Sequence, residues 1–293
     1  MPGVKVQKIG GVVTAVARRL GTAGLAYGHG TMNAREEAAW LVLHACGVPS
    51  GVLEQHSAVP VTPPQLRRIE SLVERRIGAR IPVAYLLREA WLGDFRFFVD
   101  QRVIVPRSFI AELLEDELGI FLRGPVRNAL DLCTGSGCLA ILMAHAYPKA
   151  KIDAVDLSSA ALAVAKRNVA AYGLQKRIRL LRSDLYAAVE ARKYDLIISN
   201  PPYVAAEAMS DLPEEYRAEP RMALTGGQDG LQFVRRILAG ARRQLRPGGL
   251  LVCEIGHNRK ALERSFPRAP FTWLETTGGN SLVFLLEKEQ LPD

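Results

Sequence analysis

Strand-like and helix-like segments alternate from Val126 to the end of the chain, and this alternation constrains the fold more than any other feature. It favours an α/β fold in which a mostly parallel sheet carries helices on both faces. The expected strands are Asn128–Cys133, Lys151–Val155, Ile178–Arg182, Tyr194–Ser199, Gly249–Ile255, Phe271–Glu275 and Leu282–Glu287. The clearest helices between them are expected at Cys138–Ala146, Ser159–Ala171 and Leu231–Gln244. Because the link at 277–280 is too short for a parallel crossover, the last two strands should be antiparallel.

The first 90 residues have a helical pattern instead. Asn33 followed by Glu36 forms a capping box before "EAAWLVLHACG", and Gly47 is a typical helix stop. Thr62 caps a further helix, which starts with Pro63 and carries a helical apolar stripe. The segment "WLGDFRFFVDQRVIVP" then alternates as a β-hairpin does. We therefore predict a small all-helical domain over residues 1–89, a β-hairpin connector over 90–108 and an α/β domain over 109–293.

Charge and composition limit the surroundings of the protein. The net charge is +8, from 38 Lys and Arg against 30 Asp and Glu, and it favours polyanionic partners such as nucleic acid or a nucleoprotein particle, although solubility alone can explain it. Four cysteines without Cys-x-x-Cys spacing and five scattered histidines indicate reduced thiols and no metal site. No stretch reaches the roughly 18 apolar residues of a membrane span, and the N-terminus lacks a signal cleavage site. We expect a cytoplasmic protein.

The residues that follow the first four strands form a set. Parallel strands end at one edge of a sheet, where open α/β folds bind ligands. The first strand leads into "DLCTGSGCLA", in which Gly135 and Gly137 allow a tight turn and close approach of the backbone to a ligand. Asp156 follows the second strand, near the spacing of a ribose-binding acid. Asp184-Leu185 follows the third and is placed to meet an adenine amino group, and "NPPY" at 200–203 follows the fourth.

Each feature also has a purely structural interpretation. The glycine turn alone fits any dinucleotide-binding protein, Asp156 can be a helix cap, Asp184 can lie in a surface turn, and Asn-Pro can simply end a strand. Their joint placement at consecutive strand ends favours one nucleoside-binding cleft over four unrelated turns.

These motifs resemble the class I S-adenosylmethionine-dependent methyltransferases. "NPPY" is similar to the tetrapeptide of enzymes that methylate planar amino or amide nitrogens: adenine in DNA, guanine in RNA, and glutamine in proteins. "RIPVAYLLREAWLGDFRFFVDQRVIVPRS" and "EPRMALTGGQDGL" resemble the HemK-like protein glutamine methyltransferases. Within that family, "VPRS…AEL" is closer to the ribosomal branch, known as PrmB, than to the release-factor branch. The PrmB branch usually has Pro where this chain has Phe109.

The resemblance implies a Rossmann-like class I fold with a mostly parallel seven-stranded sheet and an antiparallel last strand. It implies S-adenosyl-L-methionine as cofactor and the third large-subunit ribosomal protein as substrate, free or within a pre-ribosomal particle, recognised by the helical domain. Cofactor contacts fall on Asp131, Cys133, Thr134, Gly135, Ser136, Gly137, Asp156, Leu157, Asp184, Leu185 and Asn200, and catalysis falls on Asn200, Pro201, Pro202 and Tyr203.

Other functions stay open on the residues alone. Methylation of release factors would use the same motifs, and so would methylation of an adenine or guanine amino group in nucleic acid. No segment with aromatics among basic residues supports the nucleic-acid substrate. A dinucleotide-dependent dehydrogenase would have no use for the tetrapeptide. A non-catalytic module that only senses the cofactor would leave Asn200 free to change.

The tetrapeptide suits a planar, weakly nucleophilic amide. We hypothesise that the side-chain oxygen of Asn200 and the carbonyl of Pro201 each accept one N–H of the target, because such hydrogen bonds strengthen as positive charge grows on nitrogen. The prolines hold the carbonyls rigidly and offer no competing N–H. Tyr203 can lie against the flat amide.

Overall fold

The computed structural model describes residues 7–49, 51–115 and 118–292, and it divides into two compact units. The helical unit comprises Met1–Ala90 together with the short segment Pro213–Ala218. The α/β unit comprises Trp91–Leu212 and Glu219–Asp293. The division falls near residue 90, and nothing in the sequence pattern predicted that six residues from the middle of the chain would join the helical unit. No helix in the described part of the chain is long and apolar enough to cross a membrane.

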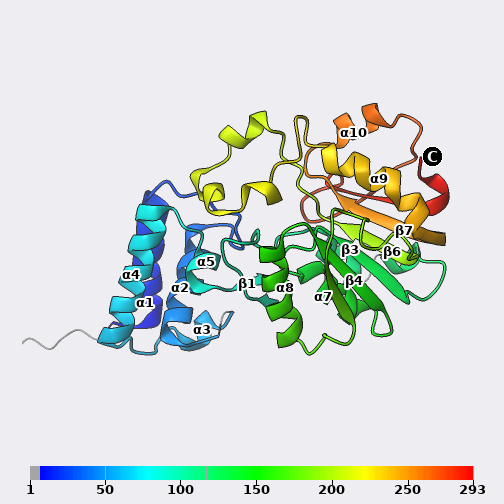
Figure 1. Ribbon diagram of the computed structural model, residues 1–293. Coiled ribbons are helices and arrows are strands. Elements are labelled where there is room, and N and C mark those ends of the chain that lie inside the picture. The colour runs from blue at the N-terminus through cyan, green and yellow to red at the C-terminus, as the bar shows by residue number, and fades with distance from the viewer. Residues whose placement is uncertain (1–6, 50, 116–117, 293) are drawn as a thin grey trace, which may run out of the picture. The chain divides into compact units, whose positions relative to one another are not determined.

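The described residues of the helical unit form five helices: α1 Ile9–Thr22, α2 Ala34–Cys46, α3 Leu53–His56, α4 Pro63–Ala79 and α5 Val83–Leu87 (Figure 1). The predicted caps are confirmed. The Asn33 side chain accepts hydrogen bonds from the backbone N–H groups of Arg35 and Glu36, and Gly47 ends α2 in the left-handed conformation. Thr62 and Gln65 form a capping box at the start of α4. These local signals lie within a few residues of one another, which is why the sequence alone locates them.

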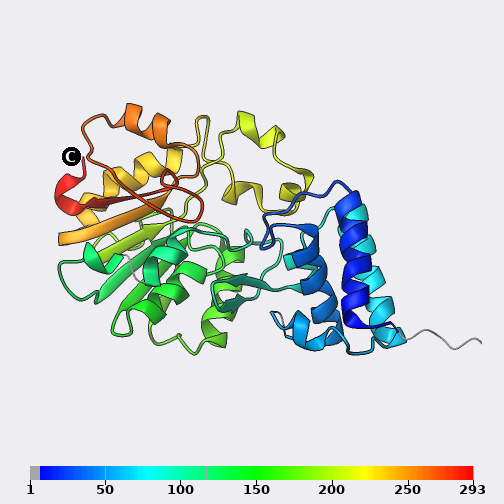
Figure 2. The same cartoon turned by 180° about the vertical axis from the view of Figure 1, so that it is seen from behind.

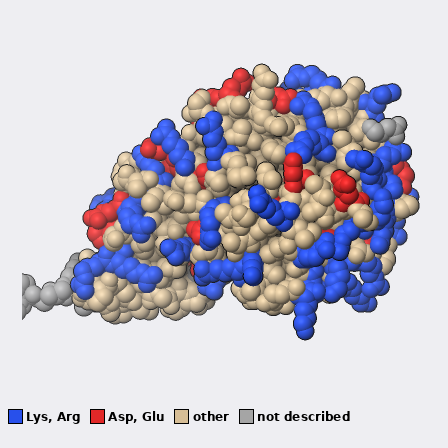
Figure 3. Space-filling view, in the orientation of Figure 1, with Lys and Arg blue, Asp and Glu red and all other residues tan. Residues whose placement is uncertain are grey.

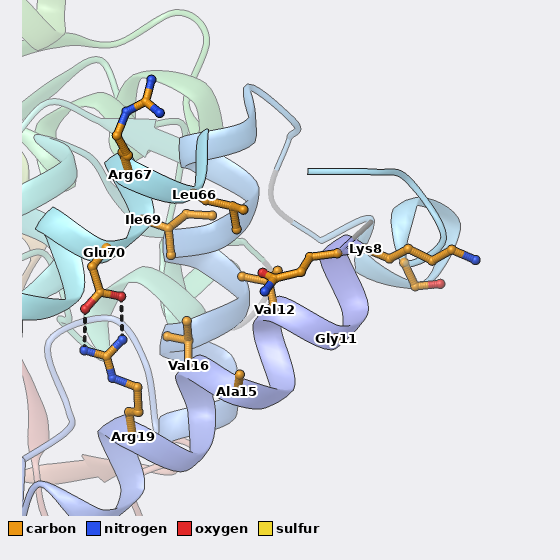
Figure 4. A pocket seen from close by; sticks show the side chains of 12 residues that line it. Lys8, Gly11, Val12, Ala15, Val16, Arg19, Leu66, Arg67, Ile69 and Glu70 are labelled. Carbon is orange, nitrogen blue, oxygen red and sulfur yellow. Dashed lines mark hydrogen bonds and ion pairs between the residues drawn. The ribbon is translucent and has the colours of Figure 1, made fainter. Parts of the chain in front are cut away.

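An apolar groove runs along α1 and α4 in the helical unit. Val12 and Val16 line it from α1, and Leu66 and Ile69 from α4 (Figure 4). Arg19 borders the groove and donates two hydrogen bonds to Glu70, at 2.6 and 2.7 Å (Figure 4). Both charged side chains are roughly half exposed, so this pair contributes little to stability.

A buried charge cluster explains why the segment Pro213–Ala218 belongs to the helical unit. The Arg76 side chain, 1% exposed, donates to Glu37 at 2.6 Å, to Glu215 at 3.1 Å and to the carbonyl of Ala26 at 2.9 Å. Burial raises the pKa of Glu37. Burial also acts to raise the pKa of Glu215, but hydrogen bonds from the backbone and from Arg76 outweigh it and lower that pKa. Removing Arg76 would leave the buried Glu37 without this cationic partner and Glu215 with Arg80 at 3.6 Å.

The α/β unit contains a seven-stranded sheet in the order β5-β4-β3-β6-β7-β9-β8. Its strands are β3 Asn128–Leu132, β4 Lys151–Asp156, β5 Ile178–Arg182, β6 Tyr194–Ser199, β7 Leu245–Glu254, β8 Thr272–Leu274 and β9 Val283–Glu287. The pairs from β5 to β7 are parallel, and β9 is antiparallel to both β7 and β8. The predicted α/β class with a mostly parallel sheet and an antiparallel last strand is confirmed. β1 Ala90–Leu92 and β2 Phe95–Phe97 form a separate two-stranded sheet within the predicted connector.

Several predicted strand ends differ from the structure, most of them by one residue, and two of the differences have clear local reasons. β3 stops at Leu132 because Cys133 has a left-handed backbone with φ of 60°. β7 begins at Leu245 and not at Gly249, because Leu245 pairs with Tyr194 and the Arg-Pro-Gly-Gly stretch is absorbed as an irregularity in the ladder. The Pro-Gly-Gly sequence reads as a turn, but here it is a bulge within a strand.

Helices cover both faces of the sheet. They are α6 Ile110–Glu115, α7 Cys138–Ala146, α8 Ser159–Ala171, α9 Gln232–Gln244 and α10 Arg259–Ser265. Figures 1 and 2 show α7 and α8 on one face and α9 and α10 on the other. Short 3₁₀ turns occur at Leu118–Ile120, Glu207–Ser210, Glu214–Ala218, Arg221–Ala223 and Lys288–Gln290. A buried core of strand side chains packs against Val234, Ile237 and Leu238 of α9, so the sheet is a rigid support for whatever its strand ends carry.

Candidate active site

The glycine-rich turn lies directly after β3 at the carboxyl edge of the sheet. Cys133, Gly135 and Gly137 have φ of 60°, 55° and 79°. A Cβ on Gly137 would lie 3.1 Å from the Cβ of Ala165 in α8, so both the backbone angle and the close approach of the helix require glycine there. The first N–H groups of α7 therefore stand at the turn, where a ligand can reach them.

Hydrogen bonds to neighbouring elements fix the rest of the turn. The backbone N–H of Thr134 donates to the carbonyl of Val155 in β4 at 2.9 Å. The buried Asn168 of α8 donates to the carbonyl of Ser136 at 2.9 Å and to that of Phe98 at 3.0 Å. Thr134 and Ser136 are themselves buried. Their side chains thus shape the turn from beneath.

Asp131 lies beneath the turn and is fully buried. Its Oδ2 accepts hydrogen bonds from the hydroxyl of Thr134 and from the backbone N–H of Ala140. Its Oδ1 is buried and has no hydrogen-bond partner among the described residues. Burial raises the pKa of this carboxyl to about 7, against the hydrogen bonds that lower it. A buried acceptor atom without a donor is costly, and a cationic or N–H-bearing ligand would relieve that cost.

Asp156 joins the end of β4 to the turn. Its Oδ2 accepts from the backbone N–H of Gly135 at 2.9 Å, and its Oδ1 accepts from that of Ser158 at 2.8 Å. Burial raises its pKa, and these backbone hydrogen bonds oppose the shift. Each carboxylate oxygen still has acceptor capacity on the side of the cleft, so a ligand with paired hydroxyl groups fits here.

A cleft of about 620 Å³, counting the part open to solvent, lies over these strand ends. The ends of β3, β4 and β6 form its floor, and the connector and the segment before α9 supply its walls. The lining residues are Arg102, Val103, Ile104, Cys133, Gly135, Asp156, Leu157, Ser158, Ala161, Asn200, Pro202, Pro220, Met222, Ala223 and Phe233. Burial raises the pKa of the Cys133 thiol, so this side chain is a neutral wall and not a thiolate. The predicted residues Cys133, Gly135, Asp156, Leu157 and Asn200 therefore meet in one cleft.

The tetrapeptide begins in this cleft. The Asn200 side chain lines it and makes no hydrogen bond to any residue within the described ranges, so its oxygen and nitrogen are available to a ligand. Pro201 and Pro202 are buried, and Pro202 also lines the cleft. The polar groups of this segment are thus the side-chain amide of Asn200 and the backbone carbonyls of the two prolines, whose φ angles are fixed by their rings.

Tyr203 is held from three sides. Its carbonyl accepts from the Asn258 side chain at 2.8 Å. A Cβ on Gly226 would lie 2.7 Å from the Cα of Tyr203, and one on Gly256 would lie 2.7 Å from the tyrosine ring. Both glycines are therefore needed for this packing. The tyrosine does not line the cleft, so its predicted contact with the target amide stays a prediction.

Glu254, at the end of β7, is a site residue that sequence reasoning missed. It is 1% exposed. Its carboxylate accepts from the hydroxyl of Ser108 at 2.6 Å, the backbone N–H of Phe109 at 3.0 Å and the hydroxyl of Tyr203 at 3.3 Å. Burial raises its pKa against these hydrogen bonds. The sequence signal that could have identified Glu254 is a single acid at the end of an apolar strand, "LLVCE".

Arg107 and Glu219 are two further residues whose role sequence reasoning missed. They connect two motifs that were recognised only by their resemblance to the family. Arg107 of "VPRS" donates two hydrogen bonds to the buried Glu219 of "EPRMALTGG", at 2.6 and 2.7 Å. Glu219 also accepts from the backbone N–H of Val105 at 2.9 Å. Pro220 follows and lines the cleft. The ion pair therefore fixes the wall of the cleft to the connector.

Six predicted cofactor residues are not among those that line the cleft. Asp131, Thr134, Ser136 and Gly137 belong to β3 and the turn after it, whereas Asp184 and Leu185 follow β5. Asp184 is about half exposed and pairs with Arg236 at 2.8 Å. Leu185 is buried within the core below, with φ of 49°. Their proposed contact with adenine stays a prediction. No group of His, Cys, Asp or Glu side chains suited to a metal ion occurs in the described ranges.

Family comparisons agree with this geometry. The Methyltransferase small domain matches residues 109–227, and the PrmC N-terminal domain matches residues 17–87. A ribosomal protein uL3 glutamine methyltransferase from Neisseria meningitidis serogroup A is 52% identical over 96% of this chain and 93% of its own length. Another with the same name, from Bordetella pertussis, is 49% identical over 98% of this chain and 97% of its own length. The chain belongs to the family of ribosomal protein uL3 glutamine methyltransferases.

Membership in this family confirms the predicted resemblance and makes the protein a methyltransferase. A solved structure, the hMettl16 catalytic domain in complex with MAT2A 3'UTR hairpin 1, is 18% identical, covers 84% of this chain and 90% of that chain, and has a TM-score of 0.51. At this identity the likeness shows the methyltransferase fold alone. The cleft at the ends of β3, β4 and β6 is therefore the candidate active site of a family member with every residue of its tetrapeptide in place.

Proposed function

We propose that the protein transfers a methyl group from S-adenosylmethionine to the side-chain amide nitrogen of a glutamine in ribosomal protein uL3. The observation that carries the proposal is the free side-chain amide of Asn200 in the cleft, followed by two rigid prolines. Near-full-length relatives named for this activity support it. A ribosomal substrate would place the reaction in the cytoplasm.

The residues at the turn fit the cofactor. Asp156 has acceptor capacity for ribose hydroxyls, and a Cβ on Gly135 would meet nothing nearer than 4.0 Å, so the turn leaves room there for the methionine part. The unpaired Oδ1 of Asp131 suits an ammonium group. The cofactor would supply a methyl group on a sulfonium: the sulfur–methyl bond would break as the nitrogen–methyl bond forms, the neutral thioether would leave, and the nitrogen would release one proton to solvent.

Asn200 and Pro201 orient the target amide. The Asn200 oxygen and the Pro201 carbonyl each accept one N–H, which turns the nitrogen lone pair toward the methyl group. These hydrogen bonds strengthen as the nitrogen gains positive charge, so they stabilise the transition state more than the bound substrate. Holding the reacting atoms in line adds an orientation effect, which reaches roughly 7–11 kcal/mol in favourable cases.

Glu254 supports this arrangement from behind. Because its carboxylate accepts from both Ser108 and Tyr203, it fixes the end of the tetrapeptide relative to the connector. Arg107 and Glu219 do the same for the wall that carries Pro220. We assign these residues positioning roles, because they act through residues that line the cleft.

The proposal is tested with labelled S-adenosylmethionine and three separate acceptors: uL3, a peptide release factor and an adenine-containing duplex DNA. Label in uL3, located by tandem mass spectrometry on a glutamine side chain, is the expected result. Label in the release factor alone would move the substrate to the other branch. Label in DNA alone would overturn glutamine methylation.

A further inference from the structure

The parallel strands have opposite charge at their two ends. β3, β4, β5, β6 and β7 each end beside an acidic or amide side chain, namely Asp131, Asp156, Asp184, Asn200 and Glu254. Each also begins beside cationic side chains. Because all five strands run the same way, these cations gather at one edge of the sheet. The exposed members used below are Arg127, Lys149, Lys176, Arg192, Lys193 and Arg243, and we call this surface the basic edge.

Two carboxylates at the basic edge are already occupied by arginines. Asp153 is 4% exposed and pairs with Arg179 at 2.9 Å and with Arg192 at 3.0 Å. Asp195 pairs with Arg246 at 3.0 Å and accepts from the backbone N–H of Arg127. These acids therefore have little capacity left to neutralise further cations at this edge.

The remaining cations lack such partners. The side chains of Arg127, Lys149, Lys176 and Arg243 are exposed and pair with no carboxylate among the described residues. The Lys193 ammonium donates to the backbone carbonyl of Arg243, which brings two cationic residues side by side. Glu190 and Glu289 are exposed acids near this edge, and Glu289 accepts a hydrogen bond from the backbone N–H of Gly248 in β7. Like charges held close together repel, and a polyanion relieves that repulsion.

The extent of the surface suits an RNA backbone. The five strands lie in the order β5-β4-β3-β6-β7, so their starts span about 19 Å at the usual spacing between strands. Figure 3 shows Lys and Arg side chains gathered over the lower right part of the α/β unit, with few Asp or Glu among them. Several phosphates of one RNA helix can be contacted over such a length.

We propose that the basic edge binds the phosphate backbone of RNA and thereby holds the enzyme on an RNA that carries its substrate. The second half of this inference rests on the proposed function, because a ribosomal protein is an RNA-binding substrate. The cleft lies at the opposite ends of the same strands, so bound RNA leaves it free. Binding through one surface raises the effective concentration of the other site for its target. The contacts are to phosphates, so we expect no sequence preference.

RNA binding is measured by fluorescence anisotropy with a labelled RNA hairpin at increasing NaCl concentrations. The test variant is Lys149→Gln/Lys176→Gln/Arg243→Gln. The matched control is Lys260→Gln/Arg264→Gln/Arg268→Gln, which removes the same charge from exposed residues in and after α10. The test variant should lose about tenfold or more in affinity, and its slope of log K against log salt should be shallower by about 2 to 3. The control should lose little of either.

Three results would overturn the proposal: no RNA binding by the wild type at physiological salt, equal losses in both variants, or tighter binding to anionic phosphatidylglycerol vesicles than to RNA. Methylation of free uL3 is measured in parallel and should be unchanged in both variants. A wild type that binds RNA but methylates uL3 neither free nor bound to RNA would contradict the proposed function and leave the RNA surface standing. A wild type that methylates uL3 but does not bind RNA would contradict the RNA surface and leave the proposed function standing.

Discussion

The two edges of one sheet differ in charge and in the partners of their buried acids. At the carboxyl edge, Asp131 and Glu254 are buried and bonded mainly to neutral donors, so their pKa values rise. At the amino edge, Asp153 is also buried but has two arginines as partners. The acids at the carboxyl edge keep acceptor capacity for a ligand, whereas the two arginines occupy the oxygens of Asp153. Because parallel strands all run the same way, they can place a reaction site at one edge of the sheet and a charged surface at the opposite edge.

The largest effect should come from the carboxyl edge, at Asn200. Asn200→Ala removes one acceptor that is strengthened only in the transition state, so kcat for uL3 methylation should fall about 10²–10³-fold, by analogy with the loss of one transition-state hydrogen bond. The affinity for uL3 should change far less. Steady-state kinetics with labelled cofactor measures both. Asn280→Ala, an exposed asparagine away from the cleft, is the control and should behave as wild type. Wild-type turnover by Asn200→Ala would refute the clamp.

The next largest effect should separate two acids of the same edge. Asp156→Ala should weaken cofactor binding about 10–100-fold, because a charge-assisted hydrogen bond of about 1.5–3 kcal/mol is lost. Asp184→Ala should have a smaller effect, because that carboxylate is half exposed, pairs with Arg236 and does not line the cleft. Calorimetry with S-adenosylmethionine compares the two. Equal losses of cofactor affinity in the two variants would place Asp184 in the cofactor site. An unchanged cofactor affinity in Asp156→Ala would show that Asp156 does not bind the ribose hydroxyls.

Glu254 tests whether support behind the tetrapeptide matters. Glu254→Ala removes the acceptor of the buried Ser108 hydroxyl and of the partly buried Tyr203 hydroxyl, and such losses cost about 1–3 kcal/mol of unfolding free energy. Urea denaturation measures this cost. Catalysis gives a second readout: kcat should fall while the cofactor affinity holds, and Glu254→Gln should restore part of kcat because it keeps an acceptor. A loss of stability with unchanged kcat would reduce Glu254 to a structural residue.

The smallest effect concerns pH and Asp131. Its folded pKa of about 7 lies above the ordinary value, so the folded state holds a proton that the unfolded state releases. This contribution to stability is therefore complete at pH below the unfolded pKa and is lost as pH rises toward 7. Asp131→Asn should flatten the dependence of unfolding free energy on pH between about 4 and 7. Denaturation at several pH values checks it, and an unchanged slope would contradict the raised pKa.

Local signals were sufficient for much of the fold. The caps at Asn33 and Thr62 and the glycine turn depend on residues close in sequence, and the structure confirms them. The alternation of strands and helices then placed Asp156 and Asn200 at one edge, because parallel strands end together. This rule requires no knowledge of side-chain packing.

Long-range pairings were beyond sequence reasoning. Glu215 reaches Arg76 across 139 residues, and Ser108 reaches Glu254 across 146 residues. Neither pair has a spacing that a pattern could detect. Asp184 satisfied the strand-end rule as well as Asp156 did, yet the structure directs it to Arg236 and not into the cleft. A rule for backbone position does not determine the direction of a side chain.

The central claim is that the carboxyl edge methylates a glutamine through Asn200. Its most direct test is tandem mass spectrometry of uL3 after reaction with wild-type enzyme and with Asn200→Ala, at equal enzyme and cofactor concentrations. We predict one methyl group on a glutamine side-chain amide with the wild type and almost none with the variant. A methyl group on another residue type, or equal methylation by both enzymes, would contradict the account.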